Sequence, residues 1–441
     1  MSGNLCGLAL LLAFGFTPVI TADDWPMYLY DISHSSFNPS AAQIGKHNAG
    51  SLDTYWSTDL LAPMAAAPTI SDGVAYVGTW DGTFYAIDAE TGSVLWSRYV
   101  GMAGDPISAH CMPAVGVSSQ AAVAGNVVYV GGGDSAIYAL DKRTGSQVWR
   151  TPLADPQSGA YLWSSVTYYQ NALYIGLASL GDCPLVRGAL VRIDLARPDK
   201  PFFRWLMPVD EVGGGIWSTP AIDARTHTVY VTTGTGEQGF LTGTWGGAML
   251  ALDATTLEIQ SYFFLPTNSV EEDIEWGSSP TLFETSYGFP LVAATGKDGI
   301  LYAQRRDTLF PFWSVRVAIE CICPECGCGS ISTPAFDGQT IYLGAGVVPG
   351  ELEEGSVYAI DPDHGTVLWS RLLPGVVIAP VTVANELLYV STTRGLLIFD
   401  AADGTLLWSG DEVTLYSQPV VLGGRVYSTQ FDGQFIARGP L

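Results

Sequence analysis

The densest concentration of reactive side chains in this 441-residue sequence is a run of four cysteines within eight residues, in a segment rich in Gly and Pro. The run consists of Cys321, Cys323, Cys326 and Cys328. Four thiolates can hold a tetrahedral zinc ion, whereas four cysteines in an oxidising compartment can form two local disulfides. Four ligands within eight residues are crowded for zinc, so the spacing favours disulfides. In either arrangement the run fastens a loop that cannot order itself.

The first 22 residues have the pattern of an export signal. Leu5 to Phe16 is an apolar stretch that is short for a membrane-spanning helix, and small residues follow it up to Ala22. We expect cleavage after Ala22 and a mature chain, residues 23–441, that is periplasmic or secreted. The alternative is a retained membrane anchor. Six cysteines then remain, and an even number in an exported protein indicates disulfides.

Composition limits the partners of the chain. Charged residues make up 14% and apolar residues 48% of the sequence, so it can bury a large core. The net charge is −24, and binding to phosphate groups requires clustered Lys and Arg. Nucleic acid and anionic membrane surfaces are therefore excluded as partners.

An internal repeat runs along most of the chain. The block Val74–Trp96 returns as residues 127–149, as the longer 341–369 and as the shorter 387–408. Degenerate copies span residues 172–205, 229–263 and 291–313. In each copy an apolar run, a turn, a second apolar run, an Asp-x-x-Thr-Gly turn and a final run predict three strands. A fourth strand precedes each copy, as at 218–222.

Aromatic residues that close the repeats count the units. Seven closing tryptophans and Phe263 in an eighth position predict eight units; the tryptophans are Trp56, Trp96, Trp149, Trp205, Trp313, Trp369 and Trp408. The last copy, residues 420–438, lacks a closing strand, and the strand around Trp56 has nothing before it. We therefore predict a single all-β domain, an eight-bladed propeller of four-stranded antiparallel blades, in which the Trp56 strand closes the ring.

Strand order places the unusual residues on one face. Strands alternate in direction, so the loops leading into each innermost strand (lead-in loops) share a face with the turns between the second and third strands (middle turns). The lead-in loops carry His110, Cys111, Trp163, Trp217, Glu275, Trp276 and the cysteine run. The middle turns carry Trp80, Asp182, Cys183, Arg187, Thr235, Glu237, Trp245, Lys297 and Asp298. We expect a ligand site at this mouth and a Cys111–Cys183 disulfide between adjacent blades.

The repeat resembles a known family. The pattern Tyr-Ala-Ile-Asp-x-x-Thr-Gly-x-x-x-Trp, seen at 85–96, is similar to the repeat of pyrroloquinoline-quinone (PQQ) dependent alcohol dehydrogenases. The segments 24–28 and 276–280 resemble those of polyvinyl-alcohol dehydrogenases. The resemblance implies the propeller fold and a PQQ-dependent alcohol oxidation. It implies the fold more strongly than the reaction, because non-catalytic propellers share the repeat, including an outer-membrane assembly lipoprotein.

The resemblance also implies roles for individual residues. Trp217 falls where the family stacks a tryptophan on PQQ, and Lys297 where a lysine hydrogen-bonds the quinone and stabilises the charge of reduction. Glu275 lies near the position of the catalytic base, with Asp273 as a rival. The alternatives are an aromatic that packs on its own blade, an exposed turn lysine and a solvated acidic loop over residues 271–275.

The calcium ligands of the family do not match in register. Thr235 stands where an Asn is expected, and Cys183 stands where a Glu is expected, four residues before Arg187. The resemblance places Thr235 and Arg187 beside the cofactor. Ca²⁺ requires several oxygen ligands, which a shifted register would supply from Asp182, Glu237 and Glu275.

Two functional hypotheses follow. The first is a PQQ-dependent dehydrogenase acting on a small alcohol or a polymer. The sequence contains no Cys-x-x-Cys-His motif, because Gly327 follows Cys326, so haem attached to this chain is excluded and electrons would pass to an external acceptor. The second is a propeller without cofactor that acts as a scaffold or binds a polymer or a partner protein.

Overall fold

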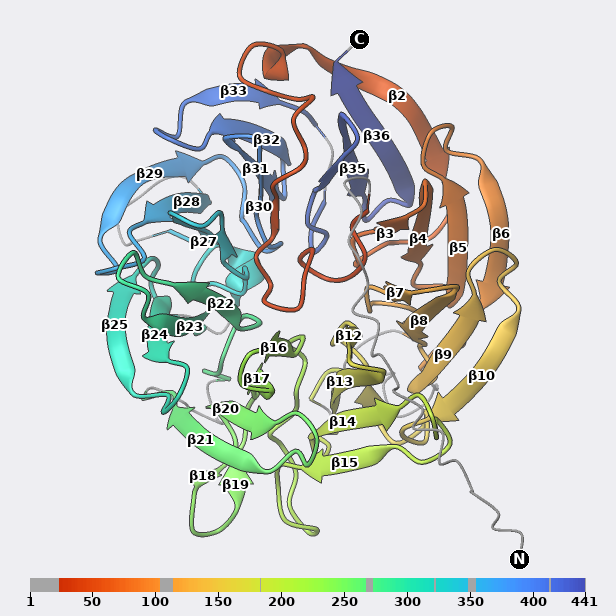
Figure 1. Cartoon of the computed structure of the whole chain (residues 1–441), viewed down its shortest axis with the longest axis vertical. Coiled ribbons are helices and arrows are strands. Elements are labelled where there is room, and N and C mark those ends of the chain that lie inside the picture. The colour runs from red at the N-terminus through yellow and green to blue at the C-terminus, as the bar shows by residue number, and fades with distance from the viewer. Residues whose placement is uncertain are drawn as a thin grey trace, which may run out of the picture.

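The computed structural model describes residues 24–103, 114–182, 184–266, 273–320, 323–347, 354–411 and 414–440. Eight four-stranded antiparallel sheets surround a central axis, which confirms the predicted all-β propeller (Figure 1). Among the described residues no helix has the length and apolar character needed to cross a membrane. The only helical elements there are two short 3₁₀ turns, η1 (Ala49–Ser51) and η3 (Pro324–Cys326).

Each blade runs from an innermost strand at the axis to an outermost strand at the rim (Figure 1). Blade 1 contains β3 (Thr69–Ser71), β4 (Val74–Gly78), β5 (Thr83–Asp88) and β6 (Val94–Tyr99). Blade 2 contains β7 (Ala122–Ala124), β8 (Val127–Gly131), β9 (Ala136–Asp141) and β10 (Gln147–Pro152). Blade 3 contains β12 (Thr167–Tyr169), β13 (Ala172–Ser179), β14 (Ala189–Asp194) and β15 (Phe202–Trp205), with β11 (Ala160–Tyr161) added to β13. Blade 4 contains β16 (Ala221–Asp223), β17 (Thr228–Thr232), β20 (Ala248–Asp253) and β21 (Ile259–Phe264), and a hairpin of β18 (Gln238–Gly239) and β19 (Thr244–Trp245) interrupts it.

The second half of the ring repeats the plan and closes it. Blade 5 contains β22 (Thr281–Glu284), β23 (Pro290–Thr295), β24 (Ile300–Arg305) and β25 (Pro311–Arg316). Blade 6 contains β26 (Ala335–Phe336), β27 (Ile341–Ala345), β28 (Gly355–Ile360) and β29 (Val367–Leu373). Blade 7 contains β30 (Thr382–Ala384), β31 (Leu387–Thr392), β32 (Gly395–Asp400) and β33 (Leu406–Ser409). Blade 8 joins the termini, because β2 (Leu52–Asp59) pairs with β36 (Gln434–Pro440) beside β34 (Val420–Leu422) and β35 (Arg425–Thr429), as predicted.

The segment before β2 crosses the central opening and binds the inner edges of the blades (Figure 1). Its short strand β1 (Phe37–Asn38) pairs in parallel with β30. Its backbone also bonds to innermost strands of other blades, at Ile70, Val123, Ile222, Leu282 and Phe336. This segment therefore supplies hydrogen-bond partners for backbone groups that a bare channel would leave to water. The path of this segment was not among the predictions from the sequence.

In blades 1, 5, 6 and 8 the closing indole joins the blade to the next one. Trp96 donates from Nε1 to the carbonyl of Lys142, the residue after the turn Asp of blade 2, at 3.2 Å. Trp56, Trp313 and Trp369 make the equivalent bond to their own neighbours at 2.9–3.2 Å. The turn glycine lies under the ring: a Cβ at Gly365, where φ is +70°, would lie 2.6 Å from the Trp313 indole. The Thr-Gly of the repeat is thus explained by the indole that covers it.

Blades 3 and 4 have no tryptophan at the closing position, and there the predicted closing residues are wrong. In blade 1 the closing Trp96 pairs with Ala86, which lies two residues before the turn residue Asp88. The same register in blade 4 pairs Ala251 with Ser261, so Phe263 lies two residues beyond the closing position. In blade 3 Trp205 likewise lies three residues beyond it. A count of aromatic residues cannot detect such shifts, because the bulge and turn lengths that set register differ between the copies.

We expect Trp56→Ala to lower the free energy of unfolding by about 3–5 kcal/mol, because the indole is 9% exposed and packs edge-to-face on Phe435 at 5.0 Å. Chemical denaturation measures this loss. The matched control is Trp205→Ala, since that ring is 38% exposed and should cost about 1 kcal/mol or less. Equal losses in the two variants would contradict the role of the closing position.

Candidate functional site

A cavity of about 490 Å³ lies where the lead-in loops and middle turns meet. All eight blades contribute to its lining, for example through Trp80, Ser118, Trp163, Trp217, Glu275, Glu325, Ile378 and Tyr416. Tyr28, from the segment that crosses the opening, also lines it and places its hydroxyl 3.2 Å from Thr333 Oγ1 and 3.4 Å from Ser279 Oγ. The volume lies within the roughly 300–1,000 Å³ typical of small-molecule sites.

Glu275 is the centre of the polar network in this cavity. Its Oε1 accepts a hydrogen bond from Trp217 Nε1 at 3.1 Å, and its Oε2 accepts bonds from the backbone N–H and the hydroxyl of Thr235. Gly234 is required beside it, because a Cβ there would lie 2.7 Å from Oε2. The carboxylate is only 7% exposed, so these donors replace the water that it has lost.

Lys297 supplies the positive charge. Its Nζ lies 2.8 Å from Asp273 Oδ2, 2.9 Å from Glu275 Oε1 and 5.9 Å from the centre of the Trp217 ring. Burial alone would lower the pKa of Lys297, but the charges of Glu275 and Asp273 outweigh it and raise this pKa above its ordinary value. The structure thus brings Trp217, Thr235, Asp273, Glu275 and Lys297 into one connected group.

Asp182 adds a further acidic group to the same lining. Burial, and then the negative charges of Glu275 and Asp273, raise its pKa to about 6, against the opposing effect of Lys297. Its backbone has a φ of +57°, a conformation that Asp and Asn tolerate better than most residues. The cavity therefore holds more negative than positive charge.

Other predicted residues lie elsewhere. Glu237 is exposed, next to the β18–β19 hairpin, and does not line the cavity. Arg187 packs on the Trp205 ring at 4.7 Å and donates from Nε to the Met207 carbonyl at 2.6 Å. Among the mouth residues expected from strand order, Trp245 and Trp276 are buried core residues, with exposed fractions of 6% and 1%.

The cysteine run shows one pair among the described residues. Cys323 and Cys326 form a disulfide across the 3₁₀ turn η3. A disulfide is the alternative to zinc that the spacing favoured, and these two sulfurs are not free to act as thiolate ligands. Cys111, Cys183 and Cys321 lie outside the described residues, as does His110, so the predicted Cys111–Cys183 bridge stays a prediction.

Sequence reasoning missed two aromatic residues in the lining, Tyr28 and Tyr416. Tyr28 belongs to the 24–28 segment, whose unusual composition was a signal, but its place at the cavity depends on the path of that segment across the opening. Tyr416 lies on the lead-in loop of blade 8, and only the closed ring brings this loop to the same mouth.

Comparison with known proteins now identifies the family. The PQQ-repeat profile described as "Outer membrane protein assembly factor BamB" matches residues 43–176 and 353–438. The chain belongs to the PQQ-repeat propeller family. Within this family it is similar to a polyvinylalcohol dehydrogenase of a Pseudomonas species, with 24% identity over 88% of this chain and 67% of that protein.

Other members of the family share the fold or part of the sequence. A quinohemoprotein alcohol dehydrogenase of Comamonas testosteroni is 26% identical over 48% of this chain and 34% of its own length. The solved structure of a europium-containing methanol dehydrogenase superposes with a TM-score of 0.80 and 15% identity, covering 95% of this chain and 98% of the other. The chain spans about two thirds of the first relative and one third of the second. At such identities the structural match establishes the fold alone.

We expect Asp182→Asn to stabilise the protein at pH 8 by about 1–2 kcal/mol. The raised pKa means that ionised Asp182 costs stability above about pH 6, and Asn removes that charge while tolerating the positive φ. The gain should shrink as the pH falls through 6 and vanish near pH 4, where Asp182 is protonated in the folded protein. Thermal denaturation across this range measures it, and a gain independent of pH would contradict the assigned cause.

Proposed function

We propose that this chain is a PQQ-dependent dehydrogenase that oxidises an alcohol outside the cytoplasm. The observation that carries the proposal is the mutual contact of Trp217, Glu275 and Lys297 inside a cavity of suitable size. A ring platform, a carboxylate and a cation in contact are the groups that a quinone-dependent alcohol oxidation needs. The similarity to alcohol dehydrogenases supports the same reaction class.

The residues present fit the cofactor. Trp217 lines the cavity, and its bond to Glu275 fixes the orientation of the indole, so this ring would hold the flat quinone by stacking. Lys297 would donate to a quinone oxygen and stabilise the negative charge that develops there. The bound quinone supplies the acceptor for the two electrons that leave the alcohol carbon.

The negative charge of the lining requires a bound cation in addition to PQQ. Asp182, Asp273, Glu275 and Glu325 line the cavity, with Lys297 as the only Lys or Arg among the described residues of that lining. PQQ is itself a polycarboxylate, so such a site would repel it unless a cation is bound. Calcium takes oxygen ligands, and Asp182 is a suitable donor in the lining, whereas Glu237 is exposed outside it and Glu275 already accepts bonds from Trp217, Lys297 and Thr235.

The two candidate bases differ in their freedom to take a proton. Glu275 accepts bonds from Trp217, Lys297 and Thr235, which occupy its lone pairs. Asp273 is 42% exposed and accepts bonds from Lys297 Nζ and from the Thr235 hydroxyl, which it shares with Glu275. We assign proton abstraction from the substrate hydroxyl to Asp273. Glu275 positions Lys297 and Trp217.

Substrate and electrons exchange through the mouth. The segment that crosses the opening places Tyr28 in the cavity lining, so a polymer would present an alcohol group at the mouth rather than thread the ring. Small alcohols remain alternative substrates. We propose an external electron acceptor and export by residues 1–22, which lie outside the described residues.

Titration of the apo-protein with PQQ tests the proposal, read as quinone absorbance that survives gel filtration. Near-stoichiometric retention is expected with Ca²⁺ and little retention with EDTA, because the uncompensated acidic lining repels the quinone. Trp217→Ala and Lys297→Met should abolish retention, whereas Trp205→Ala, outside the lining, should not. Absence of retained quinone under all these conditions would remove the dehydrogenase assignment and leave the scaffold alternative.

The base assignment has its own test in the loaded enzyme. We expect Asp273→Asn to retain PQQ but lower kcat by about 100-fold or more, and Glu275→Gln to lose PQQ because Lys297 and Trp217 lose their anchor. A Glu275→Gln enzyme that retains PQQ and alone loses kcat would reverse the two roles.

A further inference from the structure

A second cavity, of about 430 Å³, lies between blades 4 and 5 at the turns on the face away from the mouth. Its lining includes Tyr230, Ala251, Ser261 and Arg306. Ser261 occupies the closing position of blade 4, where most blades have a tryptophan. The cavity therefore lies where the repeat would place an indole.

The corresponding junction between blades 1 and 2 shows which side chain fills this position elsewhere in the ring. In blade 1 the Trp96 ring packs against Tyr76 at 5.9 Å, and both residues donate to the carbonyl of Lys142. In blade 4 Tyr230 donates to the equivalent carbonyl, that of Arg306, at 2.8 Å. The tyrosine and the carbonyl are conserved within the repeat of this chain, while the indole between them is missing.

Leucine replaces the turn glycine at this junction. Leu309 has a φ of +53°, and its N–H bonds to the Arg305 carbonyl as Gly365 N–H bonds to the Asp361 carbonyl in blade 6. Leu309 is 1% exposed and belongs to the apolar cluster that includes Phe263. It thus covers the apolar side of the vacated position. The part that stays open has polar and apolar surface in similar amounts.

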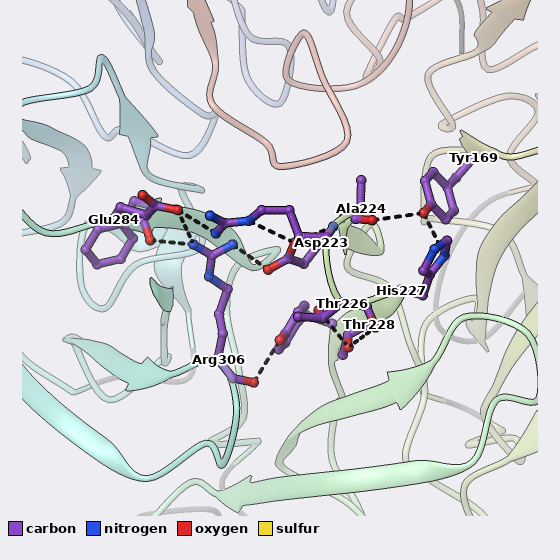
Figure 2. A network of polar contacts seen from close by, with 11 residues as sticks. Tyr169, Asp223, Ala224, Thr226, His227, Thr228, Glu284 and Arg306 are labelled. Carbon is purple, nitrogen blue, oxygen red and sulfur yellow. Dashed lines mark hydrogen bonds and ion pairs between the residues drawn. The ribbon is translucent and has the colours of Figure 1, made fainter. Parts of the chain in front are cut away.

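The charged groups around the opening are balanced (Figure 2). Arg306 Nη1 contacts Asp223 Oδ2 at 2.7 Å, with both side chains buried, at 8% and 5% exposure. Arg225 Nη2 contacts Glu284 Oε1 at 2.5 Å. Each cation therefore has a carboxylate partner, and the site offers little attraction to an ionic ligand.

Uncharged hydrogen-bonding groups complete the wall. Thr226, Thr228 and Gln260 line the cavity with hydroxyl and amide groups. Two buried atoms, Arg306 Nε and Ser261 Oγ, have no hydrogen-bond partner among the described residues. An unpaired buried polar group is unfavourable, so a ligand that supplies a hydroxyl to either atom gains affinity.

We propose that this cavity binds a neutral polyhydroxylated molecule, a polyol or a sugar. Balanced ion pairs and a net charge of −24 disfavour an anion, and the mixture of hydroxyl, amide and apolar groups in the wall suits a ligand that has both hydroxyl groups and C–H surface. A molecule with several hydroxyls can both donate to and accept from such a wall. The proposal is independent of the dehydrogenase assignment, since none of these residues lines the first cavity.

The test uses the full chain and xylitol as probe, with saturation-transfer NMR and titration calorimetry. Wild-type protein should bind xylitol, and Ser261→Ala should bind it about fivefold more weakly, the loss expected for one hydrogen bond. Ser370→Ala, at an exposed strand position of blade 6, is the matched control and should leave binding unchanged.

A filled-cavity variant provides the decisive comparison. Ser261→Trp with Leu309→Gly recreates the indole–glycine pair of the other junctions, so the protein should fold with an equal or higher melting temperature and lose xylitol binding. Where this double variant does not fold, Gln260→Ala, on the exposed edge of the wall, replaces it and should weaken binding. No binding to wild type, unchanged binding to these variants, or displacement of xylitol by indole or citrate would overturn the proposal.

Discussion

The contact between a closing indole and the turn of the next blade is the interaction on which this ring depends. It combines burial of a large aromatic surface with a hydrogen bond to a turn carbonyl, as Trp313 does with Pro362. It also requires a glycine beneath the ring, as at Gly365. Because each such contact joins one blade to its successor, the contact of Trp56 with the turn of blade 1 completes the circle between the two ends of the chain.

A rigid ring allows the mouth to hold groups that would otherwise repel one another. Asp182, Asp273 and Glu275 lie around a single buried Lys297, and the cost appears in the raised pKa of Asp182. Asp273 and Glu275 lie on the loop that leads into the innermost strand β22, which the segment crossing the opening binds at Leu282. Asp182 and Lys297 lie on middle turns, between the second and third strands of their blades.

The exceptions to the repeat gather in neighbouring blades. Trp217 and Thr235 of blade 4, and Asp273, Glu275 and Lys297 of blade 5, form the polar network of the first cavity. On the opposite face of the same two blades, Ser261 and Leu309 replace the indole–glycine pair, and the second cavity opens there. Natural proteins often break local sequence rules at functional sites. The two departures from the repeat coincide here with the two candidate ligand sites.

Residue spacing was enough to predict the architecture: the spacing of Asp-x-x-Thr-Gly and Trp predicted strands, turns and blade number, because these short-range patterns depend only on residues close in the chain. It also placed Trp217, Glu275 and Lys297 on one face. Tertiary structure alone decided that their side chains touch, that Arg187 turns to Trp205 and that Glu237 lies outside the cavity. It likewise decided that Tyr28 reaches the cavity and that Ser261, not Phe263, occupies the closing position of blade 4. These outcomes depend on strand register and on contacts between distant segments, which residue spacing does not encode.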